Sequence, residues 1–120
     1  MNLLYVFIGG GIGSLLRYAF ALYPLPISNN FPWSTFVANI LACIVIGFVS
    51  NMYVRGDLNT QTRLLLATGF CGGLSTFSTF SLETLQLLQK GNFIMAGVYV
   101  FVSVTICLLA VAVPVFVAVK

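Results

Sequence analysis

A row of hydrogen-bond donors runs along the last apolar segment of the sequence. Tyr99, Ser103 and Cys107 recur every four residues, so they share one face of a helix. Tyrosine and serine offer hydroxyl donors, and cysteine offers a weaker thiol donor. In a dry path through a protein, such donors would replace the hydration shell of a small anion. The same row also suits ordinary polar contacts between packed helices, so both interpretations are open at this point.

Two further features would suit the same chemistry. Asn39 lies inside an apolar segment, so its amide must meet either another helix or an anion path. Phe77 and Phe80 lie three residues apart on one helix face, and the edges of aromatic rings are electropositive. Taken alone, the two phenylalanines are better explained by apolar packing, since the chain holds 11 of them. Glu83 continues this face and is the only carboxylate expected within the membrane.

The elements that position these residues are helices in a lipid bilayer. The chain has 120 residues, of which 60% are hydrophobic and 6% charged, against about 25% charged residues in soluble domains. The uncharged stretches between Arg17 and Arg55 and between Lys90 and Lys120 each exceed the roughly 20 residues that span a bilayer. We predict an all-α membrane protein with a single domain, residues 1–120, and four transmembrane helices at about 3–23, 33–54, 62–89 and 93–119.

The first span combines small residues with one cation. Gly9, Gly13 and Arg17 share a face, and the glycine pair at spacing four predicts close helix packing. Arg17 either extends its charge to the membrane interface or places it in a water-filled vestibule, where it would concentrate anions. The segment lacks the basic start and cleavage site of a signal peptide, so we expect it to be retained.

The third span contains the string GFCGGLSTFSTF at residues 69–80. Gly69, Gly72 and Gly73 weaken a helix, and the serines and threonines after them can bond the backbone in other ways. One interpretation is a helix broken within the membrane, where freed carbonyl groups bind ions. The other is an unbroken helix with a glycine-rich packing face. The pattern favours the two equally.

The distribution of charge bears on orientation and on partners. With four spans, both termini lie on one side with Arg55, Arg63 and Lys120, whereas Lys90 and Arg17 lie toward the other. Three basic residues against two give almost no positive-inside bias. Such a chain can insert both ways and form an inverted dimer, although the small bias can also fix one orientation. The net charge of +3 is too scattered for a nucleic-acid partner.

No enzyme is expected. The chain has no histidine and no pair of intramembrane carboxylates, and its three cysteines lack the spacing of metal ligands. Cys43 and Cys71 are interpreted as small apolar packing residues.

Three strings carry a family resemblance. GFCGGLSTFSTF at residues 69–80 is very similar to the third-helix signature of the small fluoride channels, the Fluc (CrcB) family, and is highly specific. GGGIGSLLRY at residues 9–18 and PWSTFVAN at residues 32–39 resemble the first-helix and second-helix motifs of that family, and are moderately specific. The resemblance covers all four predicted helices in order and length.

The resemblance implies a passive fluoride export channel in the plasma or inner membrane that relieves fluoride toxicity. It implies an antiparallel, dual-topology homodimer with two fluoride pores and one central structural sodium ion. The sodium ion would be held by backbone carbonyls around Gly72 and Ser75 of each subunit, and Arg17 would lie by the vestibule. The pore residues that the resemblance implies are Asn39, Phe77, Phe80, Ser78, Thr79, Tyr99, Ser103 and Cys107.

The sequence departs from the family pattern at two positions. Ser34 stands where the family usually has glycine, and Cys107 stands where a hydroxyl is often found, so the part of Cys107 in the pore is open. Some members form heterodimers of two related chains. Because this chain retains Asn39, Phe77 and Phe80, we favour a homodimer.

Two other functions fit parts of the sequence. A small multidrug-type cation transporter also has about four helices, but it needs an intramembrane carboxylate facing its substrate. Glu83 is the only candidate here. A membrane subunit without transport activity would explain the small-residue packing faces but not the donor row, Asn39 and the glycine string together.

Overall fold

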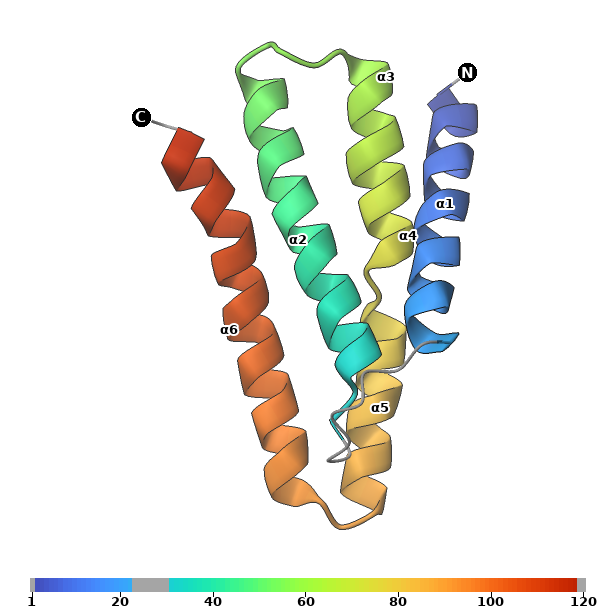
Figure 1. Cartoon of the computed structure of the whole chain (residues 1–120), viewed down its shortest axis with the longest axis vertical. Coiled ribbons are helices and arrows are strands. Elements are labelled where there is room, and N and C mark those ends of the chain that lie inside the picture. The colour runs from blue at the N-terminus through green and yellow to red at the C-terminus, as the bar shows by residue number, and fades with distance from the viewer. Residues whose placement is uncertain (1, 23–30, 119–120) are drawn as a thin grey trace.

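The computed structural model describes residues 2–22 and 31–118, and every regular element within these ranges is helical. The elements are α1 (Asn2–Leu22), α2 (Trp33–Val54), α3 (Thr60–Arg63), the π-helix η1 (Leu64–Cys71), α4 (Gly72–Leu74), α5 (Phe77–Gln89) and α6 (Phe93–Ala118). The segments α3, η1 and α4 form one continuous rod, and α5 follows below it after a short non-helical link (Figure 1).

Four helical stretches are long and apolar enough to cross a membrane, namely Asn2–Leu22, Trp33–Val54, Thr60–Gln89 and Phe93–Phe116. The predicted class, an all-helical multi-pass membrane protein with four spans, is confirmed. The third stretch begins at Thr60, two residues earlier than expected, because Asn59 caps it: its Oδ1 accepts a hydrogen bond from Thr62 N–H at 2.7 Å. The expected ends at residues 23 and 119 lie outside the described residues.

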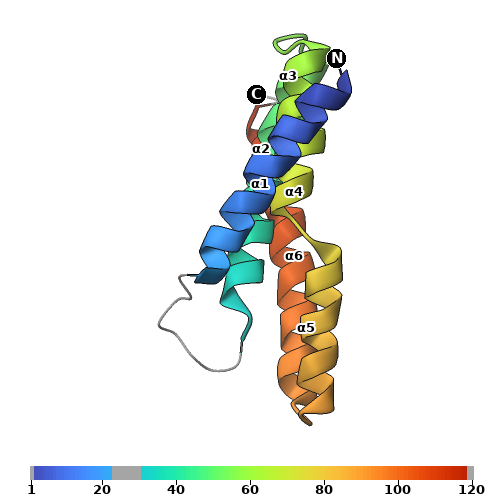
Figure 2. The same ribbon diagram turned by 90° about the vertical axis from the view of Figure 1, so that its right-hand side faces the viewer.

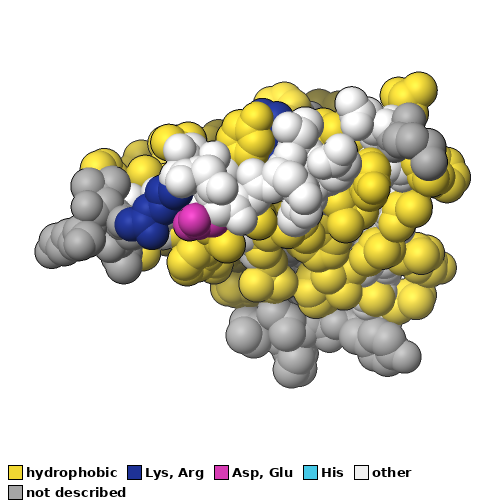
Figure 3. All heavy atoms as spheres, turned by 90° about the horizontal axis from the view of Figure 1, so that it is seen from above, with side chains coloured by type: hydrophobic (Ala, Val, Ile, Leu, Met, Phe, Trp, Pro, Cys, Tyr) yellow, Lys and Arg dark blue, Asp and Glu magenta, His cyan; other side chains and the backbone are white. Residues whose placement is uncertain are grey.

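The described chain ends and the α2–α3 connection lie at the same end of the molecule, and the α5–α6 turn lies at the other (Figure 1). The end with the α2–α3 connection shows charged and other polar side chains, while the flank beside them is hydrophobic (Figure 3). Gly56 and Gly91 follow the ends of α2 and α5 with φ of 83° and 81°, which suits the left-handed residue that commonly ends a helix. Because the number of spans is even, the chain returns to the side on which it started.

Helix α1 packs mainly on η1 and α4 rather than on α2, its neighbour in the sequence (Figure 2). The contact is made by glycines on both sides. A Cβ atom on Gly9 would collide with the Leu65 carbonyl oxygen, and one on Gly69 would lie 2.9 Å from the Val6 carbonyl oxygen. The predicted close packing through the Gly9 face is confirmed, and the third span supplies a matching face.

The other helices pack around side chains larger than glycine. Helix α2 lies against α6 and η1, and α5 lies against α6. One cluster of buried residues consists of Phe36, Leu87, Ala96 and Tyr99, and a second consists of Ala38, Ala42, Cys71 and Leu74. The first cluster joins α2 to α5 and α6, and the second joins α2 to η1 and α4, so α2 contacts both halves of the third span.

Candidate functional site

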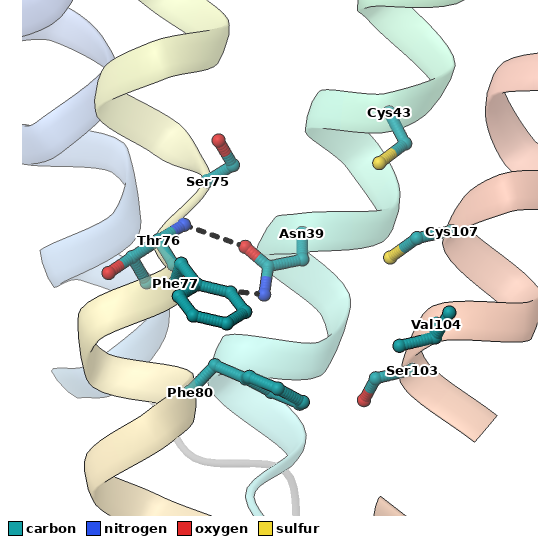
Figure 4. A pocket seen from close by; sticks show the side chains of 9 residues that line it. All are labelled: Asn39, Cys43, Ser75, Thr76, Phe77, Phe80, Ser103, Val104 and Cys107. Atoms are coloured by element: carbon teal, nitrogen blue, oxygen red, sulfur yellow. Dashed lines mark hydrogen bonds between the residues drawn. The ribbon is translucent and has the colours of Figure 1, made fainter. Parts of the chain in front are cut away.

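Helical geometry is interrupted at Ser75 and Thr76, which have extended backbones with φ/ψ of −80°/155° and −154°/126°. The interruption follows the glycines rather than coinciding with them, since Gly72 keeps helical angles. The Asn39 side chain of α2 binds the extended backbone. Its Oδ1 accepts from Thr76 N–H at 2.8 Å, and its Nδ2 donates to the Thr76 carbonyl at 3.4 Å (Figure 4). Asn39 thus takes the place of a strand partner for one residue.

The link interrupts the helical pairing of the carbonyl groups that precede it, those of residues 72–75. Thr76 N–H, which would bond the Gly72 carbonyl in a continuous helix, donates to Asn39 instead. Thr79 N–H, which would bond the Ser75 carbonyl, donates at 3.2 Å to Thr76 Oγ1, the cap of α5. The released oxygens include those of Gly72 and Ser75, the two residues for which sodium coordination was expected. Carbonyl oxygens are hard ligands of the kind that bind Na⁺.

Arg17 reaches the same region from α1. Its Nε donates to the Gly73 carbonyl at 3.1 Å, across 56 residues of sequence. Ser75 Oγ and Ser75 N–H both donate to the Cys71 carbonyl, at 2.7 and 2.9 Å. Arg17 is thus partly buried and contacts the end of α4. A role for Arg17 beside a vestibule stays a prediction.

A groove opens beside the link, between the third span, α2 and α6 (Figure 4). Its volume is about 240 Å³. Its lining residues come from all three elements: Asn39, Cys43, Ser75, Thr76, Phe77, Phe80, Ser103, Val104 and Cys107. Five of the eight expected pore residues are therefore brought together in one place.

Ser103 provides an unused hydrogen-bonding group in this groove. Its side chain is 5% exposed, and its Oγ has no hydrogen-bond partner among the described residues. A buried hydroxyl without a partner is costly and rare in folded proteins. The arrangement is therefore suited to a small ligand that accepts a hydrogen bond.

The two candidate phenylalanines lie along one wall of the groove. The ring centroids of Phe77 and Phe80 are 5.7 Å apart, with planes tilted by 37°. The Phe80 ring also packs on Tyr99, with 4.9 Å between the centroids. Phe80 is thus held on its inner side, whereas Phe77 is 78% exposed in the single chain.

Tyr99 lies away from the groove, although it shares a sequence spacing with Ser103 and Cys107. Its side chain is fully buried, and its hydroxyl donates to Glu83 Oε1 at 2.9 Å. A step of four residues rotates by about 40° around a helix, so Tyr99 and Cys107 point about 80° apart. The row of donors therefore divides between two surroundings.

Glu83 binds hydroxyl groups from two other helices. Thr35 Oγ1 of α2 donates to Glu83 Oε2 at 3.0 Å, while Tyr99 of α6 donates to the other oxygen. The hydrogen bonds of Glu83 therefore come from partner helices rather than from its own neighbours on α5. The carboxylate thereby links α2, α5 and α6 on the side of α5 that faces them.

The remaining expected site residues lie next to the groove. Ser78 Oγ is 3.3 Å from Thr76 Oγ1, and Thr79 contributes its capped amide. Sequence reasoning missed four residues: Cys43, Thr76 and Val104 as lining residues, and Thr35 as a partner of Glu83. Two of them had a signal, because Thr35 is a polar residue one turn before Asn39 in an apolar segment and Thr76 lies in the glycine string.

The fold and the groove define a small four-span membrane protein built around an interrupted helix. A family model described as "CrcB-like protein, Camphor Resistance (CrcB)" matches residues 4–115. The chain belongs to the CrcB family, and the resemblance noted from its motifs is confirmed.

Curated relatives share most of the length of the chain. The "Fluoride-specific ion channel FluC" of Phocaeicola vulgatus is 46% identical over 112 residues, which cover 92% of each chain. The protein of the same name from Desulfotalea psychrophila is 40% identical over 120 residues, covering 100% of this chain and 94% of the relative. That from Serratia proteamaculans is 47% identical over 96 residues, covering 79% of this chain and 76% of the relative.

Proposed function

We propose that this chain is a fluoride-selective channel that lets cytoplasmic fluoride leave passively across the membrane. Relatives similar over most of its length carry the name of fluoride-specific ion channel. The observation that carries the proposal for this chain is the Ser103 hydroxyl, which is buried in a groove lined by aromatic rings and finds no partner within residues 2–22 and 31–118. A membrane channel of this kind is not an enzyme.

The groove suggests how fluoride would be selected. Ser103 Oγ is a donor that no other described residue binds, and the Asn39 amide nitrogen carries two N–H groups, of which Thr76 uses one. The edges of Phe77 and Phe80 add weak positive charge without adding water. A narrow path with few donors suits a small anion, while the larger chloride ion fits poorly and gains weaker hydrogen bonds. Fluoride that enters a cell as neutral HF would leave as the anion.

The active form is proposed to be an antiparallel homodimer with two pores. In the single chain the groove is open at its side, and Phe77 is largely exposed even though it lines the groove. A second copy would enclose both. Arg55 and Arg63 flank the α2–α3 connection, and Lys90 lies at the opposite turn. So small a difference in the number of basic residues between the two ends suits a chain that inserts in both directions.

A sodium ion at the helix interruption is part of the same proposal. The Gly72 and Ser75 carbonyl groups, released from helical pairing, are the residues that would hold it, with the same pair from a second copy. When bound, the ion would supply the positive charge that holds four carbonyl dipoles together. Asn39 and Arg17 keep the interruption open by binding Thr76 and Gly73.

A cation transporter of the multidrug type is less well supported. Such a protein needs a carboxylate that is free to exchange a proton for its substrate. Both oxygens of Glu83 accept hydrogen bonds, from Thr35 and from Tyr99, and Glu83 does not line the groove. A heterodimeric fluoride channel stays an alternative, because a related partner chain would enclose the groove as well as a second copy does.

The test is ion efflux from liposomes that contain only this chain. A fluoride electrode and a chloride electrode follow release after the membrane potential is clamped. Fast fluoride release with chloride retained is the expected result, and it also favours the homodimer. Release of both ions at similar rates would contradict selectivity. No release from folded protein would contradict the homodimeric channel, and restored release on adding a related chain would indicate the heterodimer.

The aromatic wall can be tested in the same assay. Phe77→Leu and Phe80→Leu remove the ring edges from the groove, and each is expected to reduce fluoride efflux at least tenfold while the protein stays folded. Phe7→Leu is the matched control, since Phe7 is 77% exposed, like Phe77, but lies on α1 and not in the groove. Unchanged efflux in both groove variants would exclude a role for the rings.

A further inference from the structure

The groove holds a pair of thiols that the proposed function does not use. Cys43 projects from α2 and Cys107 from α6, and their sulfur atoms lie one above the other on the groove side of these helices (Figure 4). Both side chains line the same groove, from neighbouring helices. Both are free and partly exposed, so a reagent in the groove can reach them.

The number of sulfur atoms limits the kind of ion that would fit. No group of three or more histidine, cysteine, aspartate or glutamate side chains lies together in residues 2–22 and 31–118. Zinc needs four ligands in a structural site. Two sulfur atoms instead suit a soft ion that binds in linear, two-coordinate geometry, since thiolates select soft metals.

The charge of the two thiolates further limits the kind of ion that would fit. Binding to sulfur requires thiolates, so the two cysteines would contribute two negative charges to a groove with mostly apolar walls. A divalent ion cancels both charges, whereas a monovalent ion bridging the pair would leave one uncompensated, which is expensive in an apolar setting. The ion that meets all three conditions of softness, linear coordination and double charge is Hg²⁺.

We propose that Cys43 and Cys107 form a two-thiolate site for soft divalent ions such as Hg²⁺, placed inside the groove. With HgCl₂ as the reagent, two Hg–Cl bonds and two S–H bonds break, two Hg–S bonds form, and two HCl leave. No oxidant is needed. The bridging ion would stand between α2 and α6 and obstruct passage along the groove, in which Ser103 and Asn39 lie.

Binding is tested on the purified full-length chain in detergent, with mass spectrometry counting Hg after treatment with HgCl₂ and titration with a monothiol competitor. One Hg per chain is expected in the wild type. Removing Hg from the wild type should need about 100-fold more competitor than removing it from the Cys43→Ala or Cys107→Ser variant, because two linked ligands act at high effective concentration. Cys71→Ala is the matched control and should behave as the wild type, since Cys71 is only 2% exposed.

Two results would overturn the site. One is wild-type resistance to the competitor in either single variant, and the other is two Hg per wild-type chain, each on its own thiol. If Cys43→Ala does not fold, Cys43→Ser and Cys107→Ser carry the same comparison. Because binding is read by mass, failure of the proposed channel function would not affect it. If the channel function holds, Hg²⁺ should reduce fluoride efflux at least tenfold in the wild type and in Cys71→Ala, and dithiothreitol should reverse it.

Discussion

Replacement of Thr35 by valine tests whether the hydroxyl groups around Glu83 stabilise the helix arrangement. Valine keeps the shape of threonine but removes the donor to Glu83 Oε2, which lies 3.0 Å from Thr35 Oγ1. Hydrogen bonds to charged groups contribute about 1.5–3 kcal/mol. Thr35 is 6% exposed, so water does not replace the donor, while Tyr99 still binds the other oxygen. We expect Thr35→Val to lower the free energy of unfolding by about 1.5–2 kcal/mol, the lower part of that range.

The control is Thr35→Ser, which keeps the hydroxyl and loses one methyl group. Its expected loss is about 0.8 kcal/mol, the value of one buried methyl or methylene group. Unfolding is followed in micelles by titration with a denaturing detergent. The readout is the fluorescence of Trp33, the single tryptophan, whose ring centroid lies 5.8 Å from that of Phe36. If Thr35→Val is no less stable than Thr35→Ser, the bond to Glu83 does not stabilise the fold.

Two other substitutions test the packing face and the interruption. Gly13→Val places a side chain against the Phe70 carbonyl and should abolish the folded monodisperse peak in size-exclusion chromatography. Gly11→Val should not, since no atom of another described element lies within 4 Å of its Cβ position; equal behaviour of the two would refute the α1 contact. Asn39→Ala removes the acceptor for Thr76 N–H and should destabilise the chain by about 1–3 kcal/mol in the detergent titration, the cost of a buried amide left unpaired. Wild-type stability would show that the link does not depend on Asn39.

The hydropathy of the sequence predicts the four spans, because lipid imposes a length and a composition on every helix that crosses it. The face formed by Gly9 and Gly13 is also predictable, since spacing along one helix fixes which residues share a side. Both inferences need no knowledge of a partner helix.

The position of the interruption could not be predicted in the same way. The glycines weaken the helix, yet Gly72 stays helical and the extended residues are Ser75 and Thr76. Their conformation depends on Asn39, which comes from another helix. The bond from Arg17 to Gly73 has the same origin, because it joins residues that only the folded arrangement brings together. Spacing within one helix carries no information on such contacts.

The order in which helices leave the ribosome gives the α1 contact a consequence for biogenesis. The main partner of α1 is the third span, and the Gly73 carbonyl that Arg17 binds is made 56 residues after it. Until the third span has been made, Arg17 therefore lacks the Gly73 carbonyl as its acceptor, and α2 makes few contacts with α1. A chain stopped before the third span is complete would leave this cation without the Gly73 carbonyl as its acceptor.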